Sequence, residues 1–404
     1  MTLDLHNSPV DKLLRLLQNL ITEIDGIQSV RDSLLDALTM SPAAVTASNM
    51  EGMAEELNSK SDVGEALSQL LFGRSTADRR TSSVDMEPLV YMDPMNYYEQ
   101  QIVPIQDTLE TASSVSFDVV ELDRMSEHCP LSTLGYWVLR KEGLIDSCNL
   151  DEARLINLLL RVEDGYPENP YHNRLHVADV LQKMYYIMTR PSASCYRNKV
   201  WLLASYFACI IHDYQHLGVT NDFLVESKHA LAVRYNDQSP NENHHVAAAF
   251  EVLFQPNYHF VCNMHRKDQE EFRHLVIDLV LATDMTRHLS ILTRFHAVFR
   301  PQGVQSGEGH DDRQHVLVLQ LALKCADLGH VAASEISHRR WVSQLESEFF
   351  LQGDLEKAQH LSESPLMQER AAAVLRDHRD TCVRCVGGCV RGRQAVTRRG
   401  PAEL

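Results

Sequence analysis

The feature that most constrains the fold is a helical repeat of apolar side chains, which becomes continuous from about Phe117. Apolar residues recur at intervals of three and four, the period of one face of an α-helix. The clearest examples are residues 149–162, 199–212, 246–253, 270–283 and 316–328. Alternating strand patterns with Asn-Gly turns are nearly absent. The chain is therefore predicted to be all-α, with Asn149 as the cap of one helix.

Changes in this pattern divide the chain into parts. Residues 1–40 carry apolar side chains at heptad-like spacing, and residues 41–116 are polar enough for a linker or regulatory segment. Residues 117–368 form the patterned domain, and residues 369–404 are a divergent, basic, Gly-rich tail that we expect to be disordered. The stripe at residues 11–38 predicts either an amphipathic helix packed on its own chain or a coiled coil that forms a homodimer, although Gly26 disfavours the coiled coil.

Charge and composition exclude several classes of protein. A net charge of −17 argues against a nucleic-acid binder, which needs a basic face. The most apolar run, Val200–Ile211, is shorter than the roughly 20 residues that span a membrane. The N-terminus lacks the basic and apolar regions of a signal peptide. The nine cysteines follow no disulfide framework, so we expect reduced thiols and a cytoplasmic location.

Two histidines four residues apart, His172 and His176, lie in the sequence Tyr171-His-Asn-Arg-Leu-His-Val-Ala-Asp-Val180. A helix through this segment would place both imidazoles on one face. Such a pair suits a metal ligand beside a proton donor, although satisfied surface pairs have the same spacing.

Further polar residues follow strongly apolar segments. His212 and Asp213 come directly after Val200–Ile211, and Asp327 ends a second apolar helix. The carboxylate of Asp327 could instead pair with Lys324, one turn earlier in the same helix. A buried charge without a partner is costly, and a metal ion would satisfy these groups. Together with His176 they form a set of two imidazoles and two carboxylates, which suits zinc, manganese or iron. A bridging carboxylate can hold a second ion about 3.5–4 Å away, an arrangement that promotes displacement at phosphorus.

The motifs of this region, in their order along the chain, resemble those of class I cyclic nucleotide phosphodiesterases. They are Asn169–Val180, His212–Leu224, Tyr235–His245, Ala282–Met285, Cys325–Asp327 and Glu348–Asp354. The resemblance covers residues 117–368 and implies a compact, multi-helix domain of the HD type of metal phosphohydrolase, with a helical N-terminal extension. It implies hydrolysis of cyclic AMP, cyclic GMP or both to the 5′-monophosphate, in cyclic nucleotide signalling.

The resemblance also implies roles for individual residues. His176, His212, Asp213 and Asp327 would bind a first ion, usually Zn²⁺, and Asp213 would bridge to a second, Mg²⁺ or Mn²⁺. His172 would be the general acid that protonates the leaving 3′ oxygen. The residues that steady waters around the second ion would be His216, Glu242 and Thr283. The residues that line the nucleotide pocket would be Tyr171, Met285, Leu328 and His330.

The sequence departs from the family pattern at about Gln368. Family members continue there through helices that carry a glutamine, which hydrogen-bonds the purine, and a phenylalanine, which stacks on it. No matching residue precedes Leu404. We therefore expect a truncated and weakly active enzyme, or an inactive homologue that acts as a binding or dimerising protein. The choice between cyclic AMP and cyclic GMP is left open.

Two other interpretations compete with this one. An HD-type phosphohydrolase that acts on a different nucleotide would share the metal ligands, but should lack the motifs around Thr283 and Glu348. A zinc module at Cys382, Cys385 and Cys389 would need a fourth ligand such as His378, in surroundings that offer no packed core.

Overall fold

The computed structural model describes residues 92–190, 193, 198–298, 312–364 and 366–367. Every regular element in these ranges is helical, which confirms the all-α prediction. The elements are α5 (Pro94–Tyr97), η1 (Tyr98–Ile102), η2 (Val103–Ile105), α6 (Gln106–Glu110), η3 (Thr111–Ser113), α7 (Val119–Met125), α8 (Pro130–Lys141), α9 (Leu144–Ser147), α10 (Glu152–Asp164), α11 (Arg174–Met188), α12 (Lys199–Ile211), α13 (Asn221–Glu226), α14 (Ala230–Arg234), α15 (Pro240–Leu253), α16 (Arg266–Leu281), η5 (Met285–Arg287), α17 (His288–Val298), α18 (Asp312–Asp327), η6 (Gly329–Ala332) and α19 (Glu335–Ala358).

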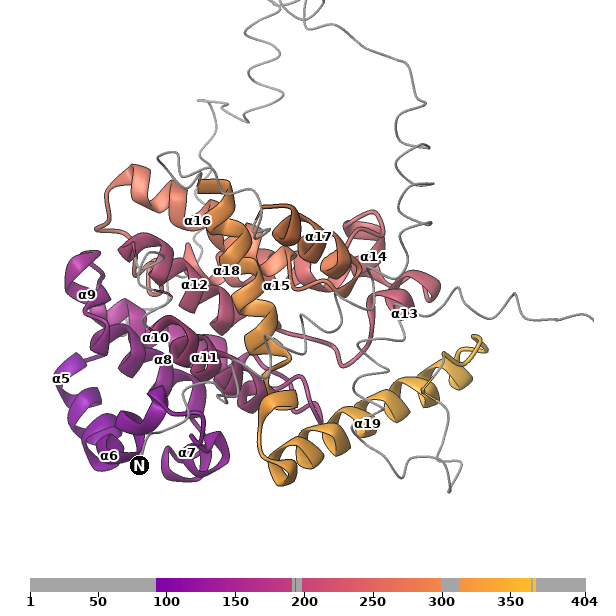
Figure 1. The fold of residues 1–404 in the computed structure, drawn as a ribbon, viewed down its shortest axis with the longest axis horizontal. Helices are drawn as coiled ribbons and strands as arrows, with labels where there is room; N and C mark the ends of the chain where they lie inside the picture. Colours follow the sequence, from indigo (N-terminus) through magenta and orange to yellow (C-terminus); the bar gives the residue numbers. More distant parts are fainter. Residues whose placement is uncertain (1–91, 191–192, 194–197, 299–311, 365, 368–404) are drawn as a thin grey trace, which may run out of the picture. The chain divides into compact units, whose positions relative to one another are not determined.

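Helix α12 is the centre of the fold. Its N-terminus is capped by Asn198, whose side-chain oxygen accepts a hydrogen bond from the backbone N–H of Val200 at 2.9 Å. Every residue from Trp201 to Ile211 is buried, as expected of a helix that is apolar all round. Helices α8, α11, α16 and α18 all contact α12, and Figure 1 shows them gathered around it. The position of α12 therefore fixes the position of His212 and Asp213, which directly follow it.

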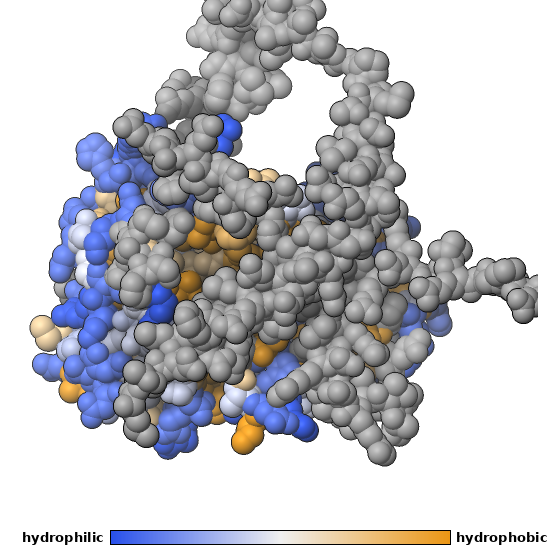
Figure 2. Space-filling model, in the orientation of Figure 1, coloured by the Kyte–Doolittle hydropathy of each residue, from blue (hydrophilic) through white to orange (hydrophobic). Residues whose placement is uncertain are grey.

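Aromatic packing holds α12 to its neighbours. The Phe207 ring lies 6.2 Å from that of Phe250 on α15, and 5.3 Å from that of Phe272 on α16. The ring of Phe260 lies 5.7 Å from Phe207, so four rings share one cluster. Figure 2 shows hydrophobic residues gathered toward the middle of the described part, with hydrophilic residues along its left margin.

The helical unit starts earlier than the expected boundary at Phe117. Ile102, Leu109 and Ala112 are fully buried in the same core as α8 and α11. Gln182 of α11 also donates a hydrogen bond of 2.7 Å to the backbone oxygen of Ala112. The segment from residue 94 to residue 113 is therefore part of the packed domain.

Two local predictions about helix starts are wrong. Helix α10 is capped by Asp151, which accepts from the N–H of Arg154 at 3.0 Å, whereas Asn149 has a φ of 52° in the preceding turn. Asn173 caps α11, so His172 lies before that helix and does not share a helical face with His176. In both cases a side chain closer to the apolar stripe satisfies the first free N–H groups of the helix.

Several predictions lie outside the described residues: the helix or coiled coil at residues 11–38, the segment at 41–91 and the tail at 369–404. In the part of the chain that is described, no helix combines the length and apolar character needed to cross a membrane. Cys129, Cys148, Cys209, Cys262 and Cys325 carry free thiols.

Candidate metal centre and active site

Three helix ends bring the predicted metal ligands together. His176 lies in the first turn of α11, where the side chain of Asn173 accepts from its backbone N–H at 3.2 Å. His212 ends α12 and is followed directly by Asp213, and Asp327 is the last residue of α18. Helices α11, α12 and α18 pack against one another. Residues far apart in sequence thus meet at one point.

The side-chain atoms of this four-residue cluster lie within a few ångströms of one another. His176 Nε2 lies 3.2 Å from Asp327 Oδ1 and 3.6 Å from Asp213 Oδ2. His212 Nε2 lies 3.2 Å from Asp213 Oδ2 and 3.6 Å from Asp327 Oδ1. The imidazoles are buried, and the carboxylates keep 14% and 23% of their side-chain surface exposed. The cluster therefore opens to solvent on its carboxylate side.

The chemistry of these donors fits a divalent metal ion. His212 Nδ1 lies 2.8 Å from the backbone oxygen of Cys209, so it donates there and leaves the Nε2 lone pair facing the carboxylates. Despite the short distances, the buried Nε2 atoms of His176 and His212 make no well-formed hydrogen bond with any described residue. Orphaned buried polar atoms are rare in proteins. Two imidazole nitrogens beside two carboxylates form a suitable ligand set.

Both carboxylates of the cluster are ionised at neutral pH. Burial alone would raise the pKa of Asp213, but the imidazole of His212 beside it more than offsets this effect and holds the pKa well below its usual value. Burial likewise acts to raise the pKa of Asp327, but the imidazoles of His176 and His212 beside it outweigh this effect, so the pKa is lowered. Ionised carboxylates and neutral imidazoles are the forms that bind metal.

A second histidine layer lies beside Asp213. His245 Nε2 is 3.8 Å from Asp213 Oδ1, and its Nδ1 lies 2.7 Å from the backbone oxygen of Tyr214. His216 Nδ1 accepts a hydrogen bond of 2.9 Å from Gly218 N–H, in a turn where Gly218 has a φ of 73°. Asp213, His216 and His245 are also close enough to hold an ion. The sequence analysis assigned no role to His245, which lies next to His244 in a predicted motif.

Glu242 and Thr283, the other residues expected to steady water, are held by their own helices. Glu242 of α15 accepts from Asn221 Nδ2 at 2.9 Å, and burial raises the pKa of Glu242 to about 7. Thr283 donates its hydroxyl to the backbone oxygen of Val280 at 2.7 Å, at the end of α16.

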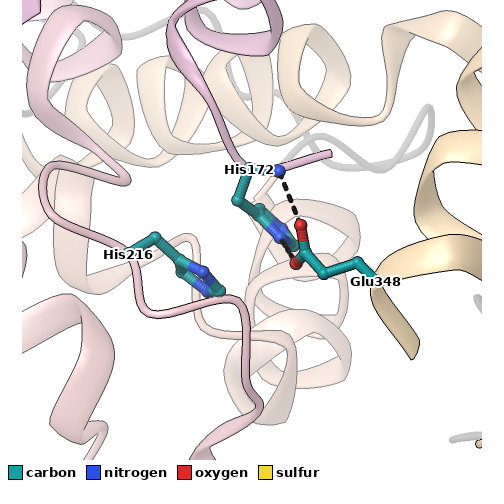
Figure 3. A group of neighbouring side chains, drawn as sticks. All are labelled: His172, His216 and Glu348. Carbon is teal, nitrogen blue, oxygen red and sulfur yellow. Dashed lines mark hydrogen bonds and ion pairs between the residues drawn. The ribbon is translucent and has the colours of Figure 1, made fainter. Parts of the chain in front are cut away.

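A histidine–carboxylate pair stands next to the cluster (Figure 3). Glu348 of α19 accepts hydrogen bonds of 3.0 Å from the backbone N–H groups of Tyr171 and His172 through Oε2. Its Oε1 makes an ion pair with His172 Nδ1. The His172 ring stacks on that of His216 with centroids 4.0 Å apart. Glu348 therefore fixes both the backbone and the ring of His172.

This pair keeps His172 protonated. Burial alone would lower the pKa of His172, but the charge and hydrogen bond of Glu348 more than offset it and raise the pKa to about 9. Burial would raise the pKa of Glu348, and the charge of His172 reverses this to give about 2. Glu348 lies in a predicted motif, but no role for it follows from the sequence. The available signal was an acidic residue directly before two phenylalanines.

The residues expected to line a nucleotide pocket are Tyr171, Met285, Leu328 and His330. Tyr171 lies against the cluster, with its ring 4.6 Å from His176 and 6.1 Å from His330. His330 is buried and its Nδ1 lies 3.3 Å from Nδ1 of His338, so this nitrogen is already engaged. Leu328 directly follows Asp327, and the sulfur of Met285 lies 4.0 Å from Lys324 Nζ.

Comparison with known proteins gives the family. The family model described as 3′5′-cyclic nucleotide phosphodiesterase matches residues 171–378, a range that includes the four-residue cluster, His172 and Glu348. The chain belongs to this family. The match extends beyond Gln368, where the resemblance was expected to end. The phosphodiesterase domain has an all-helical fold of the HD type, as predicted, and the match favours this family over other HD-type phosphohydrolases.

Curated relatives in animals agree with this family. The chain is 32% identical over 338 residues to the Drosophila melanogaster protein named 3′,5′-cyclic-AMP phosphodiesterase, isoform F, which is 82% of this chain and 50% of the relative. It is 35% identical over 272 residues to the Rattus norvegicus 3′,5′-cyclic-AMP phosphodiesterase 4C, covering 66% of this chain and 50% of the relative. The chain thus spans about half the length of these relatives. The family is metal-dependent, in keeping with the His and Asp clusters of the structure.

Proposed function

We propose that this protein hydrolyses 3′,5′-cyclic AMP to the 5′-monophosphate. One observation carries the proposal: His172, paired with Glu348, stands beside a cluster of two buried imidazoles and two carboxylates. A proton donor next to a metal-binding set is what cleavage of a phosphodiester requires. The names of the relatives support cyclic AMP as the substrate. They also disfavour the alternative of an inactive binding protein.

The proposed metal ligands are His176, His212, Asp213 and Asp327. They would hold a first ion, Zn²⁺, and Asp213 would also reach a second, Mg²⁺ or Mn²⁺. Bound ions supply an activated water and stabilise the negative charge that develops on the phosphate. His216, Glu242 and Thr283 would steady waters at the second ion, and the buried, hydrogen-bonded setting of Glu242 supports a fixed position for its carboxyl group.

His172 is the proposed general acid. Its Nδ1 is engaged with Glu348, which leaves the Nε2 proton for the substrate. That proton passes to the 3′ oxygen as the bond from phosphorus to this oxygen breaks, and His172 is left neutral. The neutral ring still donates from Nδ1 to Glu348, so its orientation is kept through the step.

Tyr171, Met285, Leu328 and His330 are proposed to contact the nucleotide. Because Nδ1 of His330 faces His338, only its Nε2 is left for the purine. The domain division, the homodimer through residues 11–38 and the cytoplasmic location stay predictions.

The test compares hydrolysis with metal content in purified full-length protein. We expect the wild type to release 5′-AMP from cyclic AMP faster than 5′-GMP from cyclic GMP. His212→Ala and Asp213→Ala should each lose the metal and the activity while helical circular dichroism is kept. His128→Ala is the matched control, because this histidine is 77% exposed and distant from the cluster in sequence. Full metal occupancy in both ligand variants would refute the ligand assignment.

A further inference from the structure

One face of α19 carries a buried polar stripe formed by Glu348, Gln352 and Glu356. The three residues are spaced four apart, so they lie above one another on the helix. They are only 3%, 1% and 2% exposed, whereas the apolar neighbours Leu351 and Leu355 are 53% and 44% exposed. This reverses the usual pattern of a surface helix.

Each member of the stripe contacts a different segment of the chain. Glu348 accepts from the backbone of Tyr171 and His172, as described above. Gln352 Oε1 accepts from the backbone N–H of Thr220 at 2.8 Å. Glu356 accepts from both the backbone N–H and the hydroxyl of Ser364, each at 2.7 Å.

The side-chain amide of Gln352 connects these contacts. The Thr220 N–H can only donate, so the amide atom that faces it must be the oxygen and the other atom must be Nε2. That nitrogen donates to Thr220 Oγ1 at 3.2 Å and to Glu356 Oε1 at 2.8 Å. Both N–H groups and the oxygen of the amide are therefore engaged. Thr220 is the N-cap of α13, and the next residue, Asn221, holds Glu242.

In this half of α19 the buried side chains are polar. The buried apolar side chains of the helix, Trp341 and Val342, both lie before Glu348. From Glu348 onward the buried positions are the stripe itself and Gly353. A Cβ atom on Gly353 would come within 2.0 Å of the Met367 oxygen, so Met367 lies directly against the helix.

We propose that Gln352 and Glu356 are positioning residues that set the rotation and register of α19, so that Glu348 reaches His172. The inference rests on the proposed function, because it concerns the orientation of the general acid. One residue of slip along a helix moves a side chain by about 1.5 Å and turns it by about 100°. Such a slip breaks the contacts that Glu348 makes. The hydrogen bonds of Gln352 and Glu356, one and two turns further along the helix, prevent this slip.

The first readout needs no catalysis. In the full chain carrying Gln352→Leu or the milder Glu356→Gln, hydrogen exchange is measured for the peptide that contains Tyr171 and His172. We expect exchange about tenfold faster in this peptide, because its N–H groups lose their fixed acceptor. Leu351→Ala and Leu355→Ala, on the exposed face of the same helix, should leave the exchange unchanged.

The second readout separates positioning from general stability. With cyclic AMP as substrate, Gln352→Leu should lower kcat while KM changes little. The same change made in a Glu348→Gln background should lower kcat no further, because the group through which Gln352 acts is already lost. Equal losses in both backgrounds, or unchanged exchange at Tyr171 and His172 in a folded variant, would overturn the proposal. Absence of hydrolysis by the wild type would contradict the proposed function alone, since the exchange measurement still decides the role of the stripe.

Discussion

His172 is proposed to act as the general acid, whereas the neighbouring histidines His176 and His212 are proposed to bind metal. Its ring bonds to Glu348 and stacks on His216, outside the four-residue cluster. We expect His172→Ala to keep bound metal and to slow turnover by about 10²–10⁴-fold, the usual effect of a lost general acid. Metal analysis and kcat on the same preparation measure both properties. Loss of metal from this variant would make His172 a ligand and not the acid.

The dependence of activity on pH follows from the same pair. A general acid works only while protonated, and Glu348 raises the pKa of His172 from its ordinary value of 6.5 to about 9. The wild type should therefore keep its kcat through neutral pH and lose it as the pH rises through about 9. Glu348→Gln removes the charge that raises this pKa, so its loss of activity should begin at lower pH. Identical kcat profiles for the two proteins would contradict the role of Glu348.

Sequence could predict some residues of the site and not others. His212 and Asp213 were predictable because they follow an apolar run that has to be buried, where unpaired polar groups are costly. The role of Glu348 was not, since its partner His172 lies 176 positions away and only the fold brings them together. The expected helical face shared by His172 and His176 failed because Asn173 caps the helix between them.

At the scale of elements, helix caps position the site. Asn173 and Asn198 have the same role, at the starts of α11 and α12, and each accepts from two backbone N–H groups. Replacing either by alanine should cost about 1 kcal/mol of unfolding free energy. Only Asn173→Ala should also weaken metal binding, because His176 is in the turn that Asn173 caps. Denaturation curves and metal titrations of the two variants test this, and equal metal affinities would show that the cap has no part in the site.

The helical period predicted where elements lie better than where they end. The expected helix at 199–212 is found as α12, and the one at 270–283 as α16, which begins earlier at Arg266. Helix α19 was not singled out, because its buried face from Glu348 onward is polar and lacks an apolar repeat. The packing of residues 94–113 was also missed, although Ile105, Leu109 and Ala112 are buried at helical spacing.

At the scale of the whole molecule, oligomeric state is the open prediction. The apolar stripe at residues 11–38 lies outside the described residues, and its heptad-like spacing is the argument for a homodimer. Deleting residues 11–38 should halve the mass measured by light scattering. If the deletion variant has the same number of subunits as the full chain, the segment does not mediate dimerisation, and the alternative of a helix packed on its own chain is favoured.

The central claim is that the cluster of His176, His212, Asp213 and Asp327 is a catalytic metal centre for cyclic AMP. The most direct measurement follows release of 5′-AMP by the full-length protein before chelation, after chelation, and after Zn²⁺ and Mg²⁺ are restored. We expect hydrolysis to be lost with the metal and to return with it, while helical circular dichroism changes little throughout. A folded protein with its metal fully restored and no detectable release of 5′-AMP would contradict the account.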